Sequence, residues 1–187
     1  MSRPAEPASV LLIMGVLHTA RLTQAEIIAR VEQEFGPTQA VSTPFPFDCT
    51  TYYDDEMGRG LSRWFCTFQN CVAPCDLAAI KLRTNALEQL WAQLGQRRVN
   101  LDPGLLTPHS LILATGKDFS HRIYLRDGIY AEVTLIVRGG NLDVLPWTYA
   151  DYRLPSVRAF FDAERTAWLQ ARRHSRRTQA SPEAPHA

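Results

Sequence analysis

The dipeptide Asp127-Gly128 constrains the fold more than any other feature of this chain, because it separates two strand-like segments. Both residues tolerate the positive φ angles of a two-residue type I′ turn, so the segments are expected to form a β-hairpin. Such a turn sets Arg126 opposite Ile129 and fixes every pair beyond them. One face is then expected to carry His121, Ile123, Leu125, Tyr130, Glu132 and Thr134, and the other Arg122, Tyr124, Ala131 and Val133. The histidine and the glutamate of the first face become diagonal neighbours.

The other elements are expected to build an α+β domain around this hairpin. Residues 10–17 form a continuous apolar run with the length and character of a buried central strand. Thr23 and Glu26 make a capping-box pattern at the start of a helix that ends at Gly36-Pro37. Further strands are expected at 61–70 and 110–115, and further helices at 76–94 and 155–173. This order predicts a two-layer sandwich with helices on one face of a mainly antiparallel sheet, as in ferredoxin-like folds.

Length and composition favour a single globular domain. The chain has 187 residues, 45% hydrophobic and 21% charged, which is enough for one core. We expect a flexible lead-in over residues 1–9, one domain over 10–171 and a basic, disordered tail over 172–187. The formal net charge of +1 does not indicate nucleic acid as a partner. No apolar run is long enough to cross a bilayer, so no membrane association and a cytoplasmic location are expected.

The four cysteines do not favour a metal site. Cys49, Cys66, Cys71 and Cys75 include no CxxC pair, and no histidine accompanies the tightest cluster. No zinc site is therefore expected. Reduced, partly buried thiols are the expectation instead.

The helix expected over 76–94 carries a polar stripe beside its apolar one. Lys81, Asn85 and Glu88 follow the i, i+4, i+7 spacing that aligns side chains along one side of a helix. The apolar stripe expected in the core comprises Leu77, Ile80, Leu87, Leu90, Trp91 and Leu94. The polar stripe is either the solvated side of the helix or one wall of a pocket for phosphate or carboxylate.

Further candidate ligand-binding residues lie in the second half of the chain. Asn100 and Asp102 lie on one side of an expected strand, just before a Pro-Gly dipeptide. Asp102 suits a ligand role toward Mg²⁺ or a substrate hydroxyl, and it equally suits closing a Pro-Gly turn. Lys117 and Arg122 are candidate anion-binding residues, and Arg122 is expected to be the better anchor because its planar fork holds two oxygens at once.

His121 and Glu132 are the candidate catalytic residues. A carboxylate bonded to one ring nitrogen of a histidine raises the basicity of the other nitrogen, as in a general acid-base couple. The pair equally suits a structural hydrogen bond in a partly buried sheet. Trp147, Tyr149 and Tyr152, with Asp151, suit either a platform for a base or sugar or a lid over the core, and Tyr124 is a further ligand-binding candidate.

Several strings together resemble a known family: Pro44-Phe45-Pro46-Phe47-Asp48, Asn100-Leu101-Asp102-Pro103-Gly104, Lys117-Asp118-Phe119-Ser120-His121-Arg122, Gly128-Ile129-Tyr130-Ala131-Glu132 and Leu145-Pro146-Trp147-Thr148-Tyr149. The chain is similar to the bacterial domain-of-unknown-function family 4416 over about residues 10–165. The resemblance implies a bacterial cytoplasmic protein and supplies no activity, substrate or catalytic residue. Some relatives carry a GTP-binding label, whereas this sequence has no G-x4-G-K-[ST] loop to cradle phosphates.

Three functions are compatible with these residues. The leading hypothesis is the binding of an anionic, nucleotide-like or phosphorylated metabolite through Asn100, Asp102, Lys117 and Arg122. The second is a metal-assisted hydrolase or transferase in which His121 is the base, Glu132 orients it and Asp102 holds a divalent cation. The third is a non-catalytic protein-interaction module that uses the acidic, aromatic segment 52–56 and the basic C-terminal residues as contacts.

Overall fold

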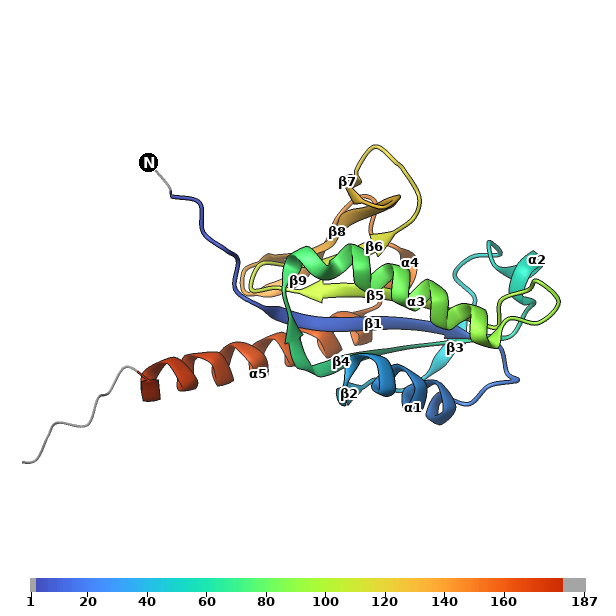
Figure 1. Ribbon diagram of the computed structural model, residues 1–187, viewed down its shortest axis with the longest axis horizontal. Coiled ribbons are helices and arrows are strands. Elements are labelled where there is room, and N and C mark those ends of the chain that lie inside the picture. The colour runs from blue at the N-terminus through green and yellow to red at the C-terminus, as the bar shows by residue number, and fades with distance from the viewer. Residues whose placement is uncertain (1–2, 180–187) are drawn as a thin grey trace, which may run out of the picture.

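The computed structural model describes residues 3–179, which include a nine-stranded sheet (Figure 1). The strands are β1 (Val10–His18), β2 (Thr38–Val41), β3 (Phe45–Phe47), β4 (Leu61–Val72), β5 (Val99–Leu106), β6 (Ser110–Thr115), β7 (Ile123–Arg126), β8 (Ile129–Arg138) and β9 (Asn141–Val144). They follow the order β2-β4-β1-β5-β6-β8-β7, with β3 beside β4 and β9 beside β8. The paired strands are antiparallel. The predicted α+β class with a mainly antiparallel sheet is confirmed.

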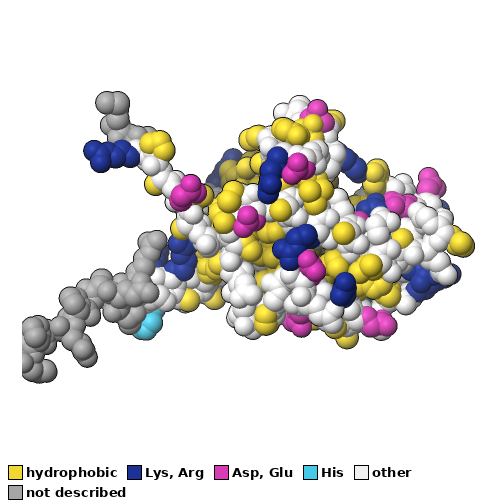
Figure 2. Space-filling model, in the orientation of Figure 1, with side chains coloured by type: hydrophobic (Ala, Val, Ile, Leu, Met, Phe, Trp, Pro, Cys, Tyr) yellow, Lys and Arg dark blue, Asp and Glu magenta, His cyan; other side chains and the backbone are white. Residues whose placement is uncertain are grey.

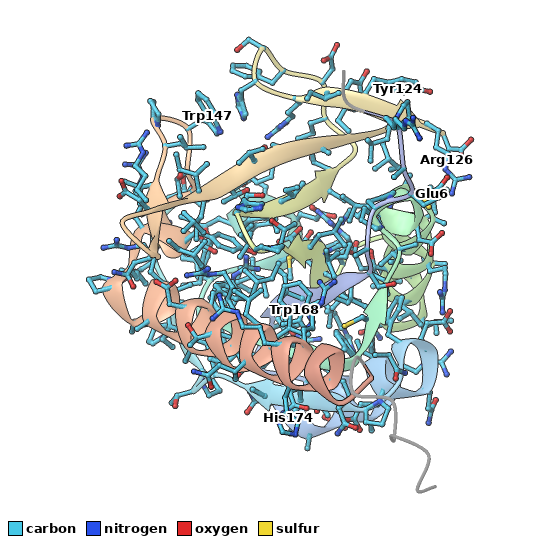
Figure 3. All side chains as sticks on the ribbon, turned by 90° about the vertical axis from the view of Figure 1, so that its left-hand side faces the viewer. Glu6, Tyr124, Arg126, Trp147, Trp168 and His174 are labelled. Carbon is cyan, nitrogen blue, oxygen red and sulfur yellow. The ribbon has the colours of Figure 1, made fainter. Side chains whose placement is uncertain are left out.

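Helices cover both faces of this sheet. They are α1 (Gln24–Phe35), α2 (Asp54–Met57), α3 (Leu77–Trp91), α4 (Ala150–Arg153) and α5 (Pro155–Gln179), with a 3-10 turn at Pro74–Asp76. Figure 3 shows α5 on one side of the strands and α1 and α3 on the other. Every residue of β1 is buried, so this strand needs cover on both sides. The predicted placement of all helices on one face, as in a ferredoxin-like sandwich, is therefore not what the structure has.

The two core layers follow the alternation of side chains along β1. Leu12 of β1 belongs to the core cluster that includes Ile27 of α1 and Ile80 of α3. Its neighbour Ile13 belongs to the cluster that includes Phe161 of α5. Successive strand residues point to opposite faces, so one strand supports both layers.

The helices α1 and α3 differ in how well the sequence predicts them. The capping box between Thr23 and Glu26 is present at the start of α1, and Gly36 is its C-cap, as expected. α3 ends at Trp91 instead of Leu94, and Leu94 is 98% exposed. Leu77, Ile80 and Leu87 of the predicted core stripe are buried, as expected, whereas Leu90 is exposed. Lys81 and Glu88 of the polar stripe are buried too, so the side of α3 that faces the sheet is shifted toward the polar stripe.

The β7–β8 hairpin has the expected turn and a different register. Asp127 and Gly128 have φ angles of 53° and 75°, as the type I′ turn requires, and Arg126 lies opposite Ile129. A β-bulge at residue 125 then shifts the pairing, so that Ile123 lies opposite Ala131 instead of Glu132. The predicted register beyond the turn is therefore wrong by one residue, and β7 begins after His121.

The chain ends depart in part from the expectation. Residues 3–9 have no regular secondary structure, and residues 1–2 of the predicted lead-in lie outside the described part of the chain. α5 continues to Gln179, so residues 172–179 of the predicted tail are helical, and residues 180–187 lie outside the description. No helix within residues 3–179 is long and apolar enough to cross a membrane.

Candidate functional site

The sheet divides between β5 and β6, and a cavity forms at the division. β5 pairs with β1 along its whole length, but it pairs with β6 only over residues 104–106. From there β6 continues beside β8 while β5 continues beside β1. The cavity has a volume of about 600 Å³ and is lined by residues of both diverging strands. This volume suits a small metabolite.

α3 supplies the hydrogen bonds that β5 lacks where the strands diverge. Lys81 Nζ donates to the carbonyl oxygen of Leu101 at 2.7 Å, and Glu88 Oε1 accepts from the Leu101 N–H at 2.8 Å. The two side chains replace a neighbouring strand, because buried backbone polar groups need partners. This demand orients α3, so the solvated interpretation of its polar stripe is wrong for Lys81 and Glu88, while Asn85 is half-buried at the cavity.

β5 runs straight through the dipeptide that resembled a turn. The backbone of Pro103 faces the same edge of β5 as that of Leu101, the edge turned away from β1. Because proline has no N–H, no backbone donor is left unpaired at this position where β5 and β6 separate. A Cβ atom on Gly104 would lie 2.5 Å from the carbonyl oxygen of Ile112 in β6. The glycine therefore permits the close approach of β5 and β6. Because β5 continues as a strand through Pro103 and Gly104, no turn forms there, and the predicted turn role of Asp102 is wrong.

An inner cluster of four polar side chains, Arg63, Asn100, Asp102 and Asp151, forms one end of the cavity lining. Arg63 Nε lies 2.9 Å from Asp151 Oδ2, and Arg63 Nη1 lies 3.2 Å from Asp102 Oδ2. Asn100 Nδ2 donates to the same Asp102 oxygen at 2.8 Å. Arg63 is only 4% exposed, so two carboxylates neutralise a buried guanidinium. These contacts tie β4, β5 and α4 together.

Gly15 allows the inner cluster to form across β1. β1 lies between β4 and β5, and Gly15 is opposite Phe65 on one side and Asp102 on the other. A Cβ atom at Gly15 would lie 2.8 Å from Arg63 Nη2 and 2.8 Å from the Tyr152 hydroxyl. The arginine thus crosses over the glycine to reach the aspartate on the far strand.

Arg97 extends the inner cluster toward α2 and α3. Its Nη1 donates to Asn100 Oδ1 at 2.8 Å and to Glu88 Oε2 at 3.1 Å. Its Nε and Nη2 donate to the two carboxylate oxygens of Glu56 at 2.5 Å and 2.7 Å. The bidentate pair fixes α2 beside the cavity.

The surroundings of Asp102 keep its carboxylate ionised. Burial acts to raise the pKa of Asp102, but the positive charges of Lys81 and Arg63 and the hydrogen bond from Asn100 outweigh it, so the pKa lies below its usual value. Two cations already occupy its neighbourhood. This charge balance does not suit Mg²⁺, which prefers oxygen ligands without competing cations.

An outer cluster of four residues, Lys117, Arg122, Glu132 and Tyr149, lines another part of the cavity. Arg122 Nε donates to Glu132 Oε2 at 2.7 Å, and its Nη2 donates to the Tyr149 hydroxyl at 2.7 Å. Its Nη1 donates to the backbone oxygen of Lys117 at 3.0 Å. All three nitrogen atoms of the Arg122 guanidinium therefore donate to protein groups. Arg122 is better suited to holding the outer cluster together than to anchoring a ligand.

Lys117 has a different environment from the other cations of the cavity. Its Nζ donates to the Tyr52 hydroxyl at 2.5 Å and lies 3.9 Å from the centre of the Tyr52 ring. Arg63, Lys81, Arg97 and Arg122 each pair with a carboxylate. Within residues 3–179, Lys117 is the lining cation that makes no ion pair with a carboxylate.

The predicted closeness of His121 and Glu132 is confirmed. His121 Nε2 lies 3.3 Å from Glu132 Oε2, although Arg122, predicted on the opposite face, makes the shorter contact to the same oxygen. The His121 ring stacks on Trp147 with centroids 5.1 Å apart, and neither residue belongs to the cavity lining. Because Glu132 already holds a guanidinium, the arrangement suits a structural cluster better than an acid-base couple facing a substrate.

The cavity brings most of the predicted binding residues together. Its lining includes Lys81, Asn85, Asn100, Asp102, Lys117, Arg122 and Tyr149, together with Glu132, which was predicted as a catalytic residue. Glu88 lies behind Lys81, bonded to β5. Tyr124 is 57% exposed and packs on Tyr130 of the hairpin, well away from Trp147 in Figure 3, so its predicted place at the site is wrong.

Two residues of the inner cluster region, Arg63 and Arg97, are absent from the predicted site. Arg63 alternates in phase with Leu61 and Phe65 along its strand, and both of these apolar residues are buried. An arginine on such a face needs a partner, and that signal was available in the sequence. Arg97 lies between α3 and β5 outside any periodic segment, and nothing in its local sequence marks it.

Comparison with known proteins identifies the family. A family model described as a domain of unknown function, DUF4416, matches residues 8–168. The chain belongs to this family. No curated protein and no solved structure matches the chain. The DUF4416 match covers the whole sheet and all the cavity-lining residues, so the cavity lies within the family domain.

Proposed function

We propose that this protein binds an anionic, nucleotide-like or phosphorylated metabolite in the cavity between β5 and β6. The observation that carries the proposal is the ammonium group of Lys117, which lines the cavity and makes no ion pair with a carboxylate within residues 3–179. An ammonium group without a paired carboxylate is a suitable partner for an anionic ligand. Lys117 is therefore the proposed anchor.

The balance of charge around the cavity supports an anion. Its lining contains five cations, Arg63, Lys81, Arg97, Lys117 and Arg122, and three carboxylates, Asp102, Asp151 and Glu132. The outer surface differs: in Figure 2, acidic and basic side chains are interspersed over the face shown. Glu56 and Glu88 lie behind the lining and pair with Arg97 and Lys81, so the charge left for a ligand is mainly that of Lys117, which suits a small anion better than an extended polyanion.

Aromatic side chains near Lys117 support a ligand that also has a ring. Tyr52, Tyr53 and Tyr149 line the cavity, and the first two meet edge to face with centroids 5.0 Å apart. Tyrosine rings stack on bases and sugars with little demand on sequence. A nucleotide-like or sugar-containing metabolite would use both the ammonium and these rings.

The interaction-module hypothesis has less support from the contacts of segment 52–56. Tyr52 lines the cavity and bonds to Lys117, and Glu56 bonds to Arg97, another residue of the lining, so both polar side chains are engaged by residues of the cavity wall. A docking loop would present them outward. The segment suits a wall of the binding site.

A thermal-shift and calorimetric screen tests the proposal. The probes are inorganic phosphate, ribose 5-phosphate and adenosine monophosphate, each with and without Mg²⁺. At 100 times the dissociation constant, a ligand of the folded state stabilises it by about 2.7 kcal/mol. For a chain of this size that corresponds to a rise in Tm of about 5–10 °C.

Lys117→Met separates the anchor from the fold. Lys117 makes no ion pair within residues 3–179, and its contacts to Tyr52 are at an exposed position, so this variant is expected to lose no more than about 1.5 kcal/mol of stability while losing the shift given by phosphorylated probes. Arg126→Met, on the tip of the hairpin outside the cavity, is the matched control and should keep the shift. Absence of any shift in the parent protein, or an undiminished shift in Lys117→Met, would overturn the proposal.

A further inference from the structure

Asp102 has one oxygen with unused hydrogen-bonding capacity. Its Oδ2 atom receives Arg63 and Asn100, whereas no hydrogen bond to Oδ1 is formed within residues 3–179. Lys81 Nζ lies 3.8 Å from Oδ1, beyond hydrogen-bonding distance. Asp102 lines the cavity, and 26% of its side chain is exposed there. A rigidly held carboxylate therefore offers an acceptor to whatever occupies this end of the cavity.

Tyr152 supplies an independent sign of a missing partner. It lines the cavity and is only 1% exposed, yet its hydroxyl has no hydrogen-bond partner among the described residues. The hydroxyl lies beside Gly15 together with Arg63 Nη2, which places it next to the inner cluster. Burial raises the pKa of this hydroxyl well above its usual value, so it stays protonated and able to donate. Buried hydroxyls are normally satisfied, so this one calls for a partner.

Charge decides which ligand group fits between Asp102 and Tyr152. A phosphate or carboxylate would meet the negative charges of Asp102 and Asp151. An ammonium group would meet the positive charges of Arg63 and Lys81. An apolar group would leave the carboxylate oxygen and the tyrosine hydroxyl unpaired. A neutral hydroxyl meets both needs, because it donates to the carboxylate and accepts from the tyrosine.

We propose that the inner end of the cavity is a hydroxyl-binding subsite, and that the ligand of this protein is a phosphorylated polyol such as a pentose phosphate or the ribose phosphate part of a nucleotide. Its hydroxyl groups contact Asp102 and Tyr152, and its phosphate contacts Lys117. This inference rests on the proposed function, because it takes Lys117 as the anion site. It adds that the part of the ligand recognised at the inner end of the cavity is a polyol.

A pair of probes with the same phosphate tests the subsite in the unmodified protein. Ribose 5-phosphate carries hydroxyls on a five-carbon skeleton, and n-pentyl phosphate carries none. A hydrogen bond to a charged group contributes about 1.5–3 kcal/mol, so ribose 5-phosphate is expected to bind at least about tenfold more tightly by calorimetry. Equal affinities would overturn the subsite and leave the anion site standing. If neither probe nor inorganic phosphate binds, both proposals fail.

Tyr152→Phe tests the same subsite through the protein. The hydroxyl has no hydrogen-bond partner among residues 3–179, so a purely structural role predicts no change in ligand affinity and no loss of stability. The subsite predicts about a three- to tenfold weaker affinity for ribose 5-phosphate and an unchanged affinity for n-pentyl phosphate. Tyr130→Phe, on β8 outside the cavity lining, is the matched control. Equal loss for both probes, or no loss for either, would contradict the assignment.

Adenosine monophosphate distinguishes the two sources of a ribose phosphate. Binding tighter than that of ribose 5-phosphate, with the same dependence on Tyr152, supports a nucleotide ligand. Weaker binding with ribose 5-phosphate retained supports a free sugar phosphate. Adenosine monophosphate binding that is strong but independent of both Tyr152 and Lys117 would overturn the assignment of the two ends.

Discussion

The inner and outer clusters line the same cavity but are built in different ways. The inner cluster is set by strand register: Arg63 and Asp102 flank β1 and meet over Gly15, and their charges are paired. The outer cluster draws Lys117 and Arg122 from the connection between β6 and β7, and Lys117 has no carboxylate partner. Substitutions of the paired charges at the inner end should therefore affect folding first, whereas removal of the Lys117 ammonium at the outer end should affect ligand binding more than folding.

The largest expected effect is that of Arg63→Met. The substitution removes the guanidinium that neutralises Asp102 and Asp151, and it leaves two carboxylates at a buried position. Breaking a buried pair in this way typically costs about 3–5 kcal/mol. Urea denaturation measures the loss in the free energy of unfolding.

The control for this substitution is Arg59→Met. Arg59 pairs with Asp54 but its side chain is 89% exposed, so the loss is expected to stay below about 1 kcal/mol. Similar losses for the two arginines would remove the distinction between a structural inner cluster and an ordinary surface.

A smaller loss is expected from Gly15→Ala. The added methyl group would stand 2.8 Å from both Arg63 Nη2 and the Tyr152 hydroxyl, so the crossing over β1 must shift. Overpacking of this kind costs about 1–3 kcal/mol. Gly116→Ala, where the new methyl meets nothing within 4 Å, should be nearly neutral. Equal thermal stability of the two alanine variants would contradict the crossing.

The smallest effect is a dependence on pH. The pKa of Asp102 is lowered in the folded state, so its ionisation stabilises the fold above the pKa of the unfolded chain, about 4, and this contribution is lost as the pH falls through the folded value. The stability difference between the parent and Asp102→Asn should be constant above about pH 5 and shrink below about pH 4, by at most about 1.4 kcal/mol per pH unit. A difference that stays constant to pH 3 would show that the ion pairs do not hold this carboxylate.

Local signals in the sequence predict local structure well. The capping box at Thr23 and the stop at Gly36 define α1, because both depend on hydrogen bonds within a few residues. The turn at Asp127-Gly128 also forms as expected, since it depends on the φ angles of two residues. The pairing beyond it does not follow, because a bulge at residue 125 depends on contacts outside the turn.

The site is predicted in part for the same reason. Asp102 stands out in the sequence as a carboxylate in an apolar strand, but its partner Arg63 lies 39 residues earlier and meets it only through β1. Lys81 and Glu88 of α3 face the sheet because the backbone N–H and carbonyl of Leu101 need partners. These groups lack strand partners only because β5 and β6 diverge. Neither the Arg63–Asp102 contact nor the burial of the polar residues of α3 can be predicted from the local sequence alone.

The central claim is that one ligand occupies the division between β5 and β6 and contacts both ends of the cavity. A titration of the ¹⁵N-labelled protein with ribose 5-phosphate, followed by amide chemical shifts, tests it most directly. The account predicts that the amide signals of Asp102 and Lys117 shift together along one saturation curve, while those of Gly139 and Gly140 in the β8–β9 turn do not move. Shifts confined to α5, or no saturable shift at either strand end, would contradict it.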